Sequence, residues 1–421
     1  MPEDPRLAVV YQPVADIRPD PGNARTHPRK QIEQIVSSIE AFGFANPILV
    51  DEHNVVIAGH GRLRAARRLG LQNVPTITLS HLTASQARAL RLADNRIAQN
   101  SGWDGELLKV ELEALSEVSF DVTVLGFSAA EIDIVLNTDE ASADDEAVPL
   151  VPAKPRTRPG DIWVLGEHRV GCGDCRDEAF VRRVMGAGVI ADMAFLDPPY
   201  NVSIADHAGV KSNHREFAMA SGEMSPEDYA AFLGASLTTA ADLSRDGAVH
   251  FVCMDWRHME ALGRVADNIY GAQLNLCVWN KSNAGMGSLY RSKHELVFVY
   301  RVGSRKHFNA IELGRHGRHR TNVWEYASVT SPRGTRRLDL QLHPTVKPAA
   351  MVADAIKDVT RRGEVVLDLF LGSGTTLVAA DRTGRRCRGV EIDPAYVDVA
   401  LERWTAITGL EPIRQHTRKG D

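Results

Sequence analysis

The sequence predicts an α/β protein in which a small N-terminal domain precedes a larger domain built on an open, mostly parallel sheet. One apolar run, Met193–Leu196, ends in Asp197 and two prolines, through which neither a strand nor a helix continues. A second apolar strand, Glu364–Phe370, runs into a glycine-rich turn and a helix. Ligands of open α/β sheets bind outside the carboxyl ends of the strands, so both strand ends are expected at one site.

The composition is that of an ordinary globular protein, with room for two or three domains in 421 residues. The net charge is −5, so a nucleic-acid partner would have to meet local positive charge. No apolar run approaches 18 residues, which argues against a membrane partner. Scattered cysteines indicate free thiols in a reducing cytoplasm. Cys172 and Cys175 form a C-x-x-C, but because no second Cys/His pair follows at finger-like spacing, no metal is expected.

Residues 1–138 are expected to form the small α/β domain. Apolar residues recur at helical spacing in Gln31–Ala41. Two short apolar segments, Pro47–Val50 and Val55–Ala58, flank a polar turn and predict a hairpin. Three further helices are expected to close the domain: Ala84–Gln99, Gly105–Glu117 and Ser128–Leu136, the last opened by a capping box of Ser128 and Glu131.

A basic helix follows the hairpin, and glycines surround the histidine at its start. Backbone amides at a helix N-terminus, with guanidinium groups beside them, favour a bound phosphate. A basic helix that turns its charges to water is an equally good interpretation. The residues of this candidate phosphate site are Gly59, His60, Gly61 and Arg62.

The segments N-P-I-L-V-D and V-V-I-A-G-H-G-R-L-R-A-A-R-R-L-G resemble the N-terminal domain of ParB-type partition proteins, a ParB/sulfiredoxin-like α/β fold. In that family the corresponding Gly/Arg motif handles nucleotide phosphates or DNA, so the resemblance implies a nucleotide or DNA at this site. Partition proteins usually carry an acidic residue and a further arginine where this chain has His60-Gly61, so hydrolysis is not implied. No helix-turn-helix is expected after the domain.

A linker is predicted at 139–160, where the periodicity stops and acidic residues give way to prolines. The larger domain, 161–421, follows. Its polar segment Asn201–Gly222 is expected to be a functional loop because it directly follows the D-P-P-Y turn. Strands are expected at Ile162–Leu165, His168–Gly171, Met193–Leu196, Ala248–Met254, Leu274–Trp279, His294–Tyr300, Glu364–Phe370 and Cys387–Ile392, and helices at 226–243 and Thr375–Arg382.

The segment Arg301–Arg337 is basic and aromatic, with nine Lys and Arg residues against two acidic ones. Positive charge beside rings that can stack is the electrostatic signature of a nucleic-acid contact. A solvated basic loop is the alternative. The candidate DNA-binding residues are Arg315, Arg318, Arg320, Arg333, Arg336 and Arg337.

The glycine-rich turn Gly372-Ser373-Gly374 opens a helix, so a ligand can approach the backbone closely at the positive end of the helix. Glu391 ends the next strand about 20 residues later, where an acid binds ribose hydroxyls in mononucleotide-binding α/β halves. A third glycine is missing, because Leu377 stands in its place. The pattern therefore indicates an adenosine-bearing cofactor and argues against NAD.

The tetrad Asp197, Pro198, Pro199 and Tyr200 places two hydrogen-bond acceptors beside an aromatic face. The carboxylate and a proline carbonyl can accept the two protons of an exocyclic amine, and the phenol can stack on the ring that bears it. The tetrad is therefore predicted to bind an extruded nucleobase. A strand ending in a proline-rich turn is the interpretation without function.

Taken together, D-P-P-Y, V-W-N-K, H-P-T-V-K-P, D-L-F-L-G-S-G-T-T and G-V-E-I-D-P resemble the amino-group DNA methyltransferases, in the permuted order of the beta class. The resemblance covers roughly 160–408. It implies a Rossmann-like sheet, catalysis by the D-P-P-Y tetrad, S-adenosyl-L-methionine as cofactor, double-stranded DNA as substrate and target recognition by 301–342. The implied cofactor residues are Asp368, Phe370, Gly372, Ser373, Gly374, Thr375, Glu391, Asp393 and Lys347.

Adenine N6 is the favoured target, since D-P-P-Y is commoner in adenine enzymes and S-P-P-Y in cytosine N4 enzymes. Cytosine N4 methylation stays open, as does a partition-type DNA-binding protein with a non-catalytic methyltransferase half. Protein or RNA substrates rank lower because such enzymes usually carry N-P-P-Y. No cysteine follows a proline, which argues against the carbon-5 cytosine enzymes. The recognition sequence, a restriction partner and the oligomeric state, a homodimer included, stay open.

Overall fold

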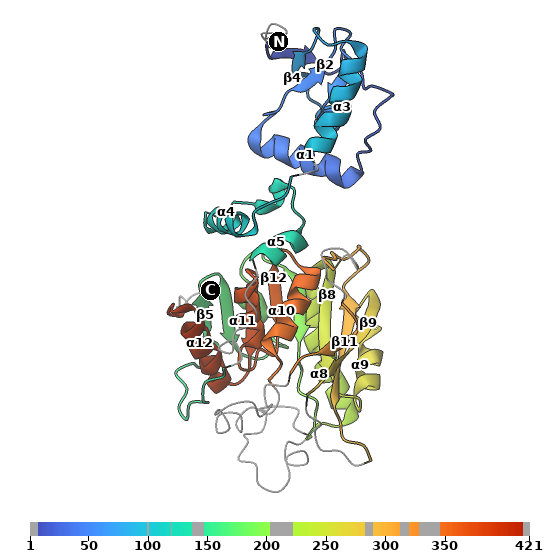
Figure 1. Ribbon diagram of the computed structural model, residues 1–421. Helices are drawn as coiled ribbons and strands as arrows, with labels where there is room; N and C mark the ends of the chain where they lie inside the picture. The colour runs from blue at the N-terminus through green and yellow to red at the C-terminus, as the bar shows by residue number, and fades with distance from the viewer. Residues whose placement is uncertain are drawn as a thin grey trace. The chain divides into compact units, whose positions relative to one another are not determined.

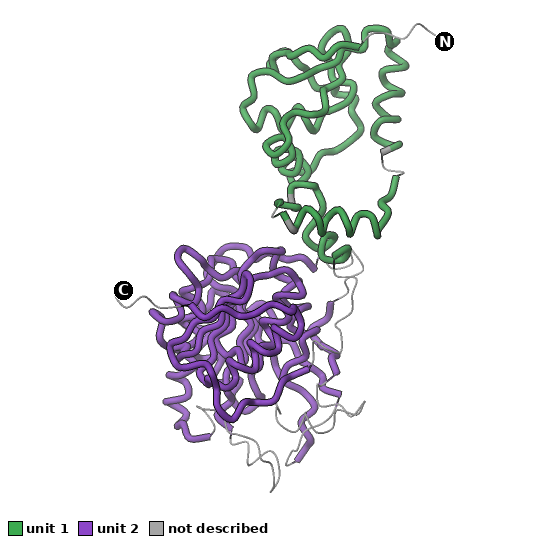
Figure 2. Tube along the Cα trace, turned by 90° about the vertical axis from the view of Figure 1, so that its left-hand side faces the viewer, with its two compact units in different colours: residues 1–136 green, residues 137–421 purple. Residues whose placement is uncertain are grey.

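The computed structural model describes residues 7–98, 101–118, 120–136, 147–202, 222–282, 289–311, 320–327 and 346–415. The chain forms two compact units, residues 1–136 and 137–421, which are coloured separately in Figure 2. Each unit has its own hydrophobic core and is described by itself.

The N-terminal unit contains a four-stranded sheet in the order β1-β4-β2-β3, of which β2 and β4 are labelled in Figure 1. The predicted hairpin is confirmed, because β2 and β3 pair antiparallel. Helices α1 and α2 pack together beside the sheet, and Ile48, Val56 and Leu63 are among the residues of the buried core. The elements are β1 (Val10–Pro13), α1 (Arg29–Phe42), β2 (Ile48–Val50), β3 (Val56–Ala58), α2 (His60–Arg68) and β4 (Asn73–Thr78).

Three helices and one 3₁₀ turn follow: α3 (Ala84–Ala98), α4 (Gly105–Glu117), η1 (Val122–Leu125) and α5 (Ala129–Leu136). Leu112, Val122 and Ile132 form a small separate core between them. The capping box is confirmed: Ser128 N donates to Glu131 Oε2 at 2.7 Å, and Glu131 N donates to Ser128 Oγ at 3.2 Å.

The large unit is organised around a ten-stranded sheet in the order β11-β9-β10-β8-β7-β12-β13-β6-β5-β14. Eight of these strands run in one direction, while β10 and β5 run antiparallel to their neighbours. The strands are β5 (Ile162–Leu165), β6 (His168–Cys172), β7 (Ala191–Leu196), β8 (Ser244–Met254), β9 (Ala272–Asn280), β10 (His294–Arg301), β11 (Val323–Glu325), β12 (Val365–Asp368), β13 (Arg386–Glu391) and β14 (Ile413–Arg414).

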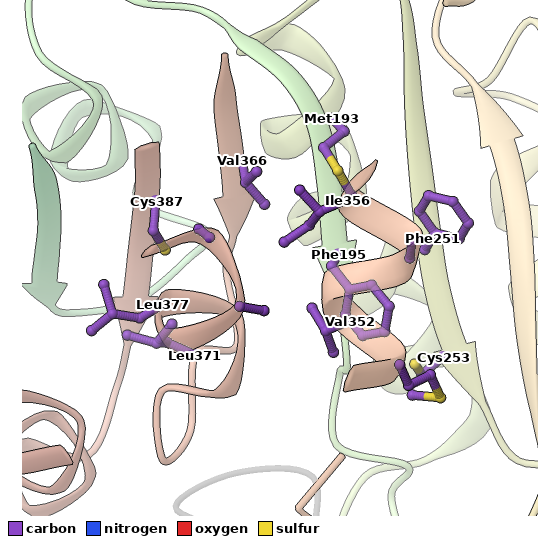
Figure 3. Packing of buried hydrophobic residues seen from close by; sticks show 14 of the residues in the cluster. Met193, Phe195, Phe251, Cys253, Val352, Ile356, Val366, Leu371, Leu377 and Cys387 are labelled. Carbon is purple, nitrogen blue, oxygen red and sulfur yellow. The ribbon is translucent and has the colours of Figure 1, made fainter. Parts of the chain in front are cut away.

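Helices cover both faces of this sheet. One face packs against α10 (Ala349–Val359), α11 (Thr375–Arg382) and α12 (Pro394–Thr408), and the other against α6 (Glu178–Met185), α8 (Pro226–Asp242) and α9 (Met259–Ala266). Because alternate strand residues point to opposite faces, Met193 and Phe195 of β7 meet Val352 and Ile356 of α10 (Figure 3). The result is a three-layer α/β architecture built on the expected open, mostly parallel sheet.

The end of the predicted linker is not free of structure. The backbone amides of Arg156 and Thr157 donate to the Asp398 carboxylate of α12 at 2.5 and 3.2 Å, and Thr157 is buried. The last part of the predicted linker is therefore fixed to α12, because a buried carboxylate holds its backbone. The acidic part of the predicted linker, 139–146, lies outside the described residues.

Candidate active site

The sheet topology brings the two predicted half-sites to one edge. Strands β7 and β12 are parallel neighbours, and β13 follows β12 in the same direction. Asp197 comes directly after β7, Asp368 is the last residue of β12, and Glu391 is the last residue of β13. Since parallel strands end at the same edge, the D-P-P-Y turn and the glycine turn after β12 share one site.

Two donors hold the Asp197 carboxylate. Tyr200 donates its hydroxyl to Oδ1 at 2.9 Å, and the Lys347 ammonium lies 2.5 Å from Oδ2. The Asp197 side chain is 24% exposed, so a substrate can still reach it. Burial raises the pKa of Asp197, Lys347 opposes this shift, and Glu295 adds to it. Lys347 was expected at the cofactor, and the structure instead places its ammonium on Asp197.

Glu295 of β10 completes a buried charge cluster that the sequence did not predict. Its carboxylate contacts Lys347 at 3.0 Å and forms a further ion pair with Lys281. Burial would raise the pKa of Glu295, but the two lysines outweigh this and hold it at about 2. Burial also disfavours charge on Lys347, yet Asp197 and Glu295 raise its pKa overall. The Glu295 carboxylate thus lies between two ammonium groups, and Lys347 lies between two carboxylates.

The carbonyl of Pro199, the second proline of the tetrad, also accepts a hydrogen bond. Tyr229 of α8 is 1% exposed and donates its hydroxyl to the Pro199 carbonyl at 2.9 Å. The His258 ring packs edge-on against Tyr229, with ring centroids 5.1 Å apart. Tyr229 was not predicted as a site residue. It fixes the turn and occupies one of the two proline carbonyls expected to face a base.

The glycine turn has backbone geometry that only glycine adopts easily. Gly372 has φ +52° and Gly374 has φ +86°, and Gly374 is the N-cap of α11. A Cβ at position 374 would lie 2.9 Å from the Cβ of Ala400 on α12. The turn is therefore a close approach between backbone segments, with its amides at the helix start.

Acidic side chains accept hydrogen bonds from backbone amides of this turn and of the residues next to it. Glu391 accepts from Gly372 N and from Asp393 N, both at 2.8 Å. Asp368 accepts from Phe370 N at 2.9 Å, and burial raises its pKa to about 7. Asp393, expected at the cofactor, caps α12 through Ala395 N at 2.9 Å. Each of these three carboxylates thus has a backbone bond in addition to any ligand contact.

The remaining predicted cofactor residues surround the same turn. Phe370 packs against Phe232 with ring centroids 6.0 Å apart. Arg403 of α12 donates to the Ser373 carbonyl at 3.2 Å and to Thr375 Oγ1 at 3.1 Å. These bonds fix the first turn of α11 from its buried side.

Of the candidate DNA-binding arginines, the structure describes Arg320 alone. Its guanidinium pairs with Asp354 at 3.0 Å and with Asp358 at 3.1 Å, and it donates to Tyr326 at 2.7 Å. Its side chain is 18% exposed, so its charge is neutralised within the protein. A DNA contact of Arg320 stays a prediction, and such a contact would have to compete with these two carboxylates. The other five, Arg315, Arg318, Arg333, Arg336 and Arg337, lie outside the described residues.

In the N-terminal unit, the glycine-histidine turn begins α2 as expected. Gly59 has φ +105°, and a Cβ on Gly61 would lie 2.8 Å from Ile35 Cδ1. His60 is buried, its Nε2 accepts from Asp20 N at 3.3 Å, and burial lowers its pKa to about 4. His60 is thus a neutral acceptor that joins two backbone segments.

The five cysteines are buried and form no disulfide bonds. Cys172 contacts the Ile392 carbonyl, and Cys175 lies 3.4 Å from Ser236 Oγ. Over the described residues, no three His, Cys, Asp or Glu side chains gather as a metal site. No helix in the same part of the chain is long and apolar enough to cross a membrane.

A parallel sheet that joins a D-P-P-Y turn to a glycine turn defines a class of nucleobase methyltransferases. Residues 191–402, half of the chain, match the family described as DNA methylase, of the N6/N4 type, and the chain belongs to this family. S-adenosyl-L-methionine is the methyl donor of this family. The glycine turn fits S-adenosyl-L-methionine, because Gly372 and Gly374 have positive φ and the turn presents backbone amides at the N-terminus of α11.

Two further matches cover the N-terminal part. Residues 5–96 match the ParB N-terminal domain, and residues 106–159 match the ParB-methyltransferase HTH domain. The expectation that no helix-turn-helix follows is wrong, because α5 and all of α4 except its first residue fall within the second match. Their apolar patterns predicted two helices but did not reveal the turn that joins them.

Individual proteins resemble different parts of the chain. A ParB-like nuclease domain-containing protein of Escherichia coli K12, YnaK, is 48% identical over 81 residues, 19% of this chain and 93% of that protein. The type II methyltransferase M.HinfI of Haemophilus influenzae is 25% identical over 230 residues, 50% of this chain and 62% of that protein. The solved structure of the cytosine-N4-specific PvuII DNA methyltransferase matches with 15% identity and a TM-score of 0.44, over 59% of this chain and 90% of that one.

Proposed function

We propose that the large unit methylates the exocyclic N6 amine of adenine in double-stranded DNA. The observation that carries this proposal is the position of Asp197 and the glycine turn at the ends of adjacent parallel strands. We assign 1–138 to the ParB-like domain, 139–160 to the linker and 161–421 to the methyltransferase domain, with target recognition in 301–342.

An amine on a nucleobase is a poor nucleophile because its lone pair is delocalised into the ring. Asp197 and the carbonyl of Pro198 would accept its two N–H bonds and favour a pyramidal nitrogen. The Pro198 carbonyl takes this role because Pro199 already accepts from Tyr229. S-adenosyl-L-methionine, when bound, supplies an electrophilic methyl group beside this nitrogen. Positioning by these acceptors contributes much of the rate, and no covalent enzyme intermediate is required.

The Asp197 carboxylate would also hold the proton that leaves the nitrogen. Burial raises the pKa of Asp197, which makes it a better proton acceptor than an exposed aspartate. The base must leave the duplex, at a cost of a few kcal/mol, and the Tyr200 ring would offset part of this by stacking. Tyr200 is already oriented by its bond to Asp197.

Identification of the modified base tests this proposal most directly. The full chain is incubated with labelled S-adenosyl-L-methionine and duplex DNA, which is then digested and analysed by mass spectrometry. We expect N6-methyladenine. N4-methylcytosine would support the runner-up, and DNA left unmodified by a protein that still binds the cofactor would support a non-catalytic binding function.

Replacement of Glu391 tests the cofactor pocket. We expect Glu391→Ala to weaken cofactor affinity by about tenfold or more, because two backbone amides of the turn lose their acceptor at about 1–3 kcal/mol each. Glu391→Gln keeps one acceptor oxygen, so its cofactor affinity should lie between those of the wild type and Glu391→Ala. Calorimetric titration measures both, and unchanged affinity in Glu391→Ala would count against the pocket.

We also propose a binding site for a nucleotide phosphate at the start of α2, formed by Gly59, His60, Gly61 and Arg62. The buried Nε of Arg62 donates to no group among the described residues, which favours a ligand at this position. Arg62→Ala should reduce binding of a labelled nucleoside triphosphate at least tenfold, whereas Arg29→Ala, a change on the exposed start of α1, should not. Equal nucleotide binding by the wild type and Arg62→Ala would contradict the proposed phosphate site.

A further inference from the structure

The four charges at the catalytic edge form one linear chain of contacts. Lys281 pairs with Glu295, Glu295 lies 3.0 Å from Lys347, and Lys347 lies 2.5 Å from Asp197. The side chains are between 6% and 26% exposed, so water screens these contacts poorly. Two cations balance two anions, and no charge in the chain is left uncompensated.

This arrangement conflicts with the proposed reaction. Asp197 must accept a proton of the base amine, yet Tyr200 holds Oδ1 and the Lys347 ammonium holds Oδ2. A strong contact with a cation reduces the ability of a carboxylate oxygen to accept from a neutral amine. Lys347 must therefore weaken its hold when the base enters the site.

Glu295 is the acceptor available for that exchange. Its Oε2 already lies within reach of Lys347 Nζ, so a small movement transfers the ammonium from one carboxylate to the other. Strand pairing holds Glu295 in place, because it lies opposite Trp279 in the β9–β10 ladder. Tyr200, whose hydroxyl lies 3.3 Å from Glu295 Oε2, can follow the same exchange.

We propose that Glu295 is a positioning residue that draws Lys347 away from Asp197 when the target amine binds, and that Lys281 limits how strongly it does so. This inference rests on the proposed methyl transfer. It assigns to Glu295 and Lys281 the control of Asp197, the acceptor in that reaction. Lys281 competes with Lys347 for one carboxylate. The strength of the Asp197–Lys347 contact is therefore set by a residue that never touches the base.

Other groups also face Asp197 and contribute to its titration. Besides Lys347, Glu295 and Tyr200, these are Tyr229 of α8, Cys253 of β8 and Asp368 of β12. Burial keeps the pKa of Cys253 well above its ordinary value, so this thiol stays neutral. Asp368 is unchanged in the variants below, so differences between them arise from the Glu295 and Lys281 charges.

Two variants with opposite changes in charge test the proposal. In Glu295→Gln, Lys347 stays on Asp197, so kcat should fall about tenfold or more. The acid limb of the pH–rate profile should move to lower pH, because Asp197 loses an anionic neighbour. In Lys281→Met, Glu295 holds Lys347 more strongly, and the loss of a cation should move the acid limb to higher pH. Glu260→Gln, a loss of charge on the exposed face of α9, should change neither.

The measurements are kcat, KM and their pH profiles with duplex DNA, together with calorimetric cofactor affinity, which should be unchanged in every variant. A merely structural role would lower activity without moving the two acid limbs in opposite directions, and that result would overturn the proposal. Normal kcat in Glu295→Gln would do the same. If Glu295→Gln does not fold, two other variants still test the proposal. Lys281→Met should move the acid limb to higher pH. Glu295→Asp keeps the charge and should show the acid limb of the wild-type protein. Wild-type activity of Asp197→Ala would instead contradict the proposed function itself.

Discussion

Asp197→Ala is expected to reduce methyl transfer by about 10²–10³-fold or more, because it removes a preorganised acceptor aimed at the reacting nitrogen. Cofactor affinity should change little, since the turn that would hold the cofactor is bonded to Asp368 and Glu391 and not to Asp197. Single-turnover kinetics and calorimetric titration of the same protein separate the two effects.

Asp197→Asn is the matched control for this prediction. It keeps the shape and one acceptor oxygen but removes the charge, so Lys347 loses an ion pair and shifts toward Glu295. We expect activity between that of wild type and Asp197→Ala. An alanine variant that turns over at the wild-type rate would mean that another residue accepts the amine protons.

Gly374→Ala is expected to abolish cofactor binding at concentrations that saturate the wild-type protein. The residue has φ +86°, which costs an alanine about 1–2 kcal/mol. Its Cβ would also lie 2.9 Å from the Cβ of Ala400, and overpacking of this kind costs about 1–3 kcal/mol. The first turn of α11 must then move, and its amides move with it. Calorimetric titration measures the loss.

A second substitution separates strain from crowding in that variant. Gly374→Ala combined with Ala400→Gly removes the facing methyl group while the strained φ remains. Partial recovery of cofactor affinity in the double variant is expected. If Gly374→Ala binds the cofactor with wild-type affinity, the turn is not the cofactor site.

The sequence predicted most elements of the sheet because their apolar runs are local signals. The predicted hairpin and the strands that became β5, β8 and β10 were found where expected, within a few residues at their ends. Strand β8 is longer than predicted at its start, where Ser244 is polar but still pairs with Ala191 of β7. Short edge strands such as β1 and β14 were missed, because two to four partly polar residues carry too little pattern.

The candidate site was predictable only where its residues are adjacent in sequence. The D-P-P-Y turn and the glycine turn are contiguous motifs, and strand ends indicated where they lie. Glu295 and Tyr229 are single residues on other elements, 98 and 32 positions after Asp197, and only tertiary packing brings them to it. Lys347 was recognised through its motif, but its partner could not be read from the motif. An ion pair between distant residues has no local signature.

The position of β12 and β13 has a consequence for biosynthesis. Strands β6 and β7 follow one another along the chain, yet β12 and β13 lie between them in the sheet. While the ribosome is still making residues 365–391, β6 and β7 each expose an unpaired edge, which is a template for aggregation. The sheet therefore cannot close during most of translation. Its assembly waits for the strand–helix–strand segment β12–α11–β13, so the facing edges of β6 and β7 stay unpaired until that segment has been synthesised.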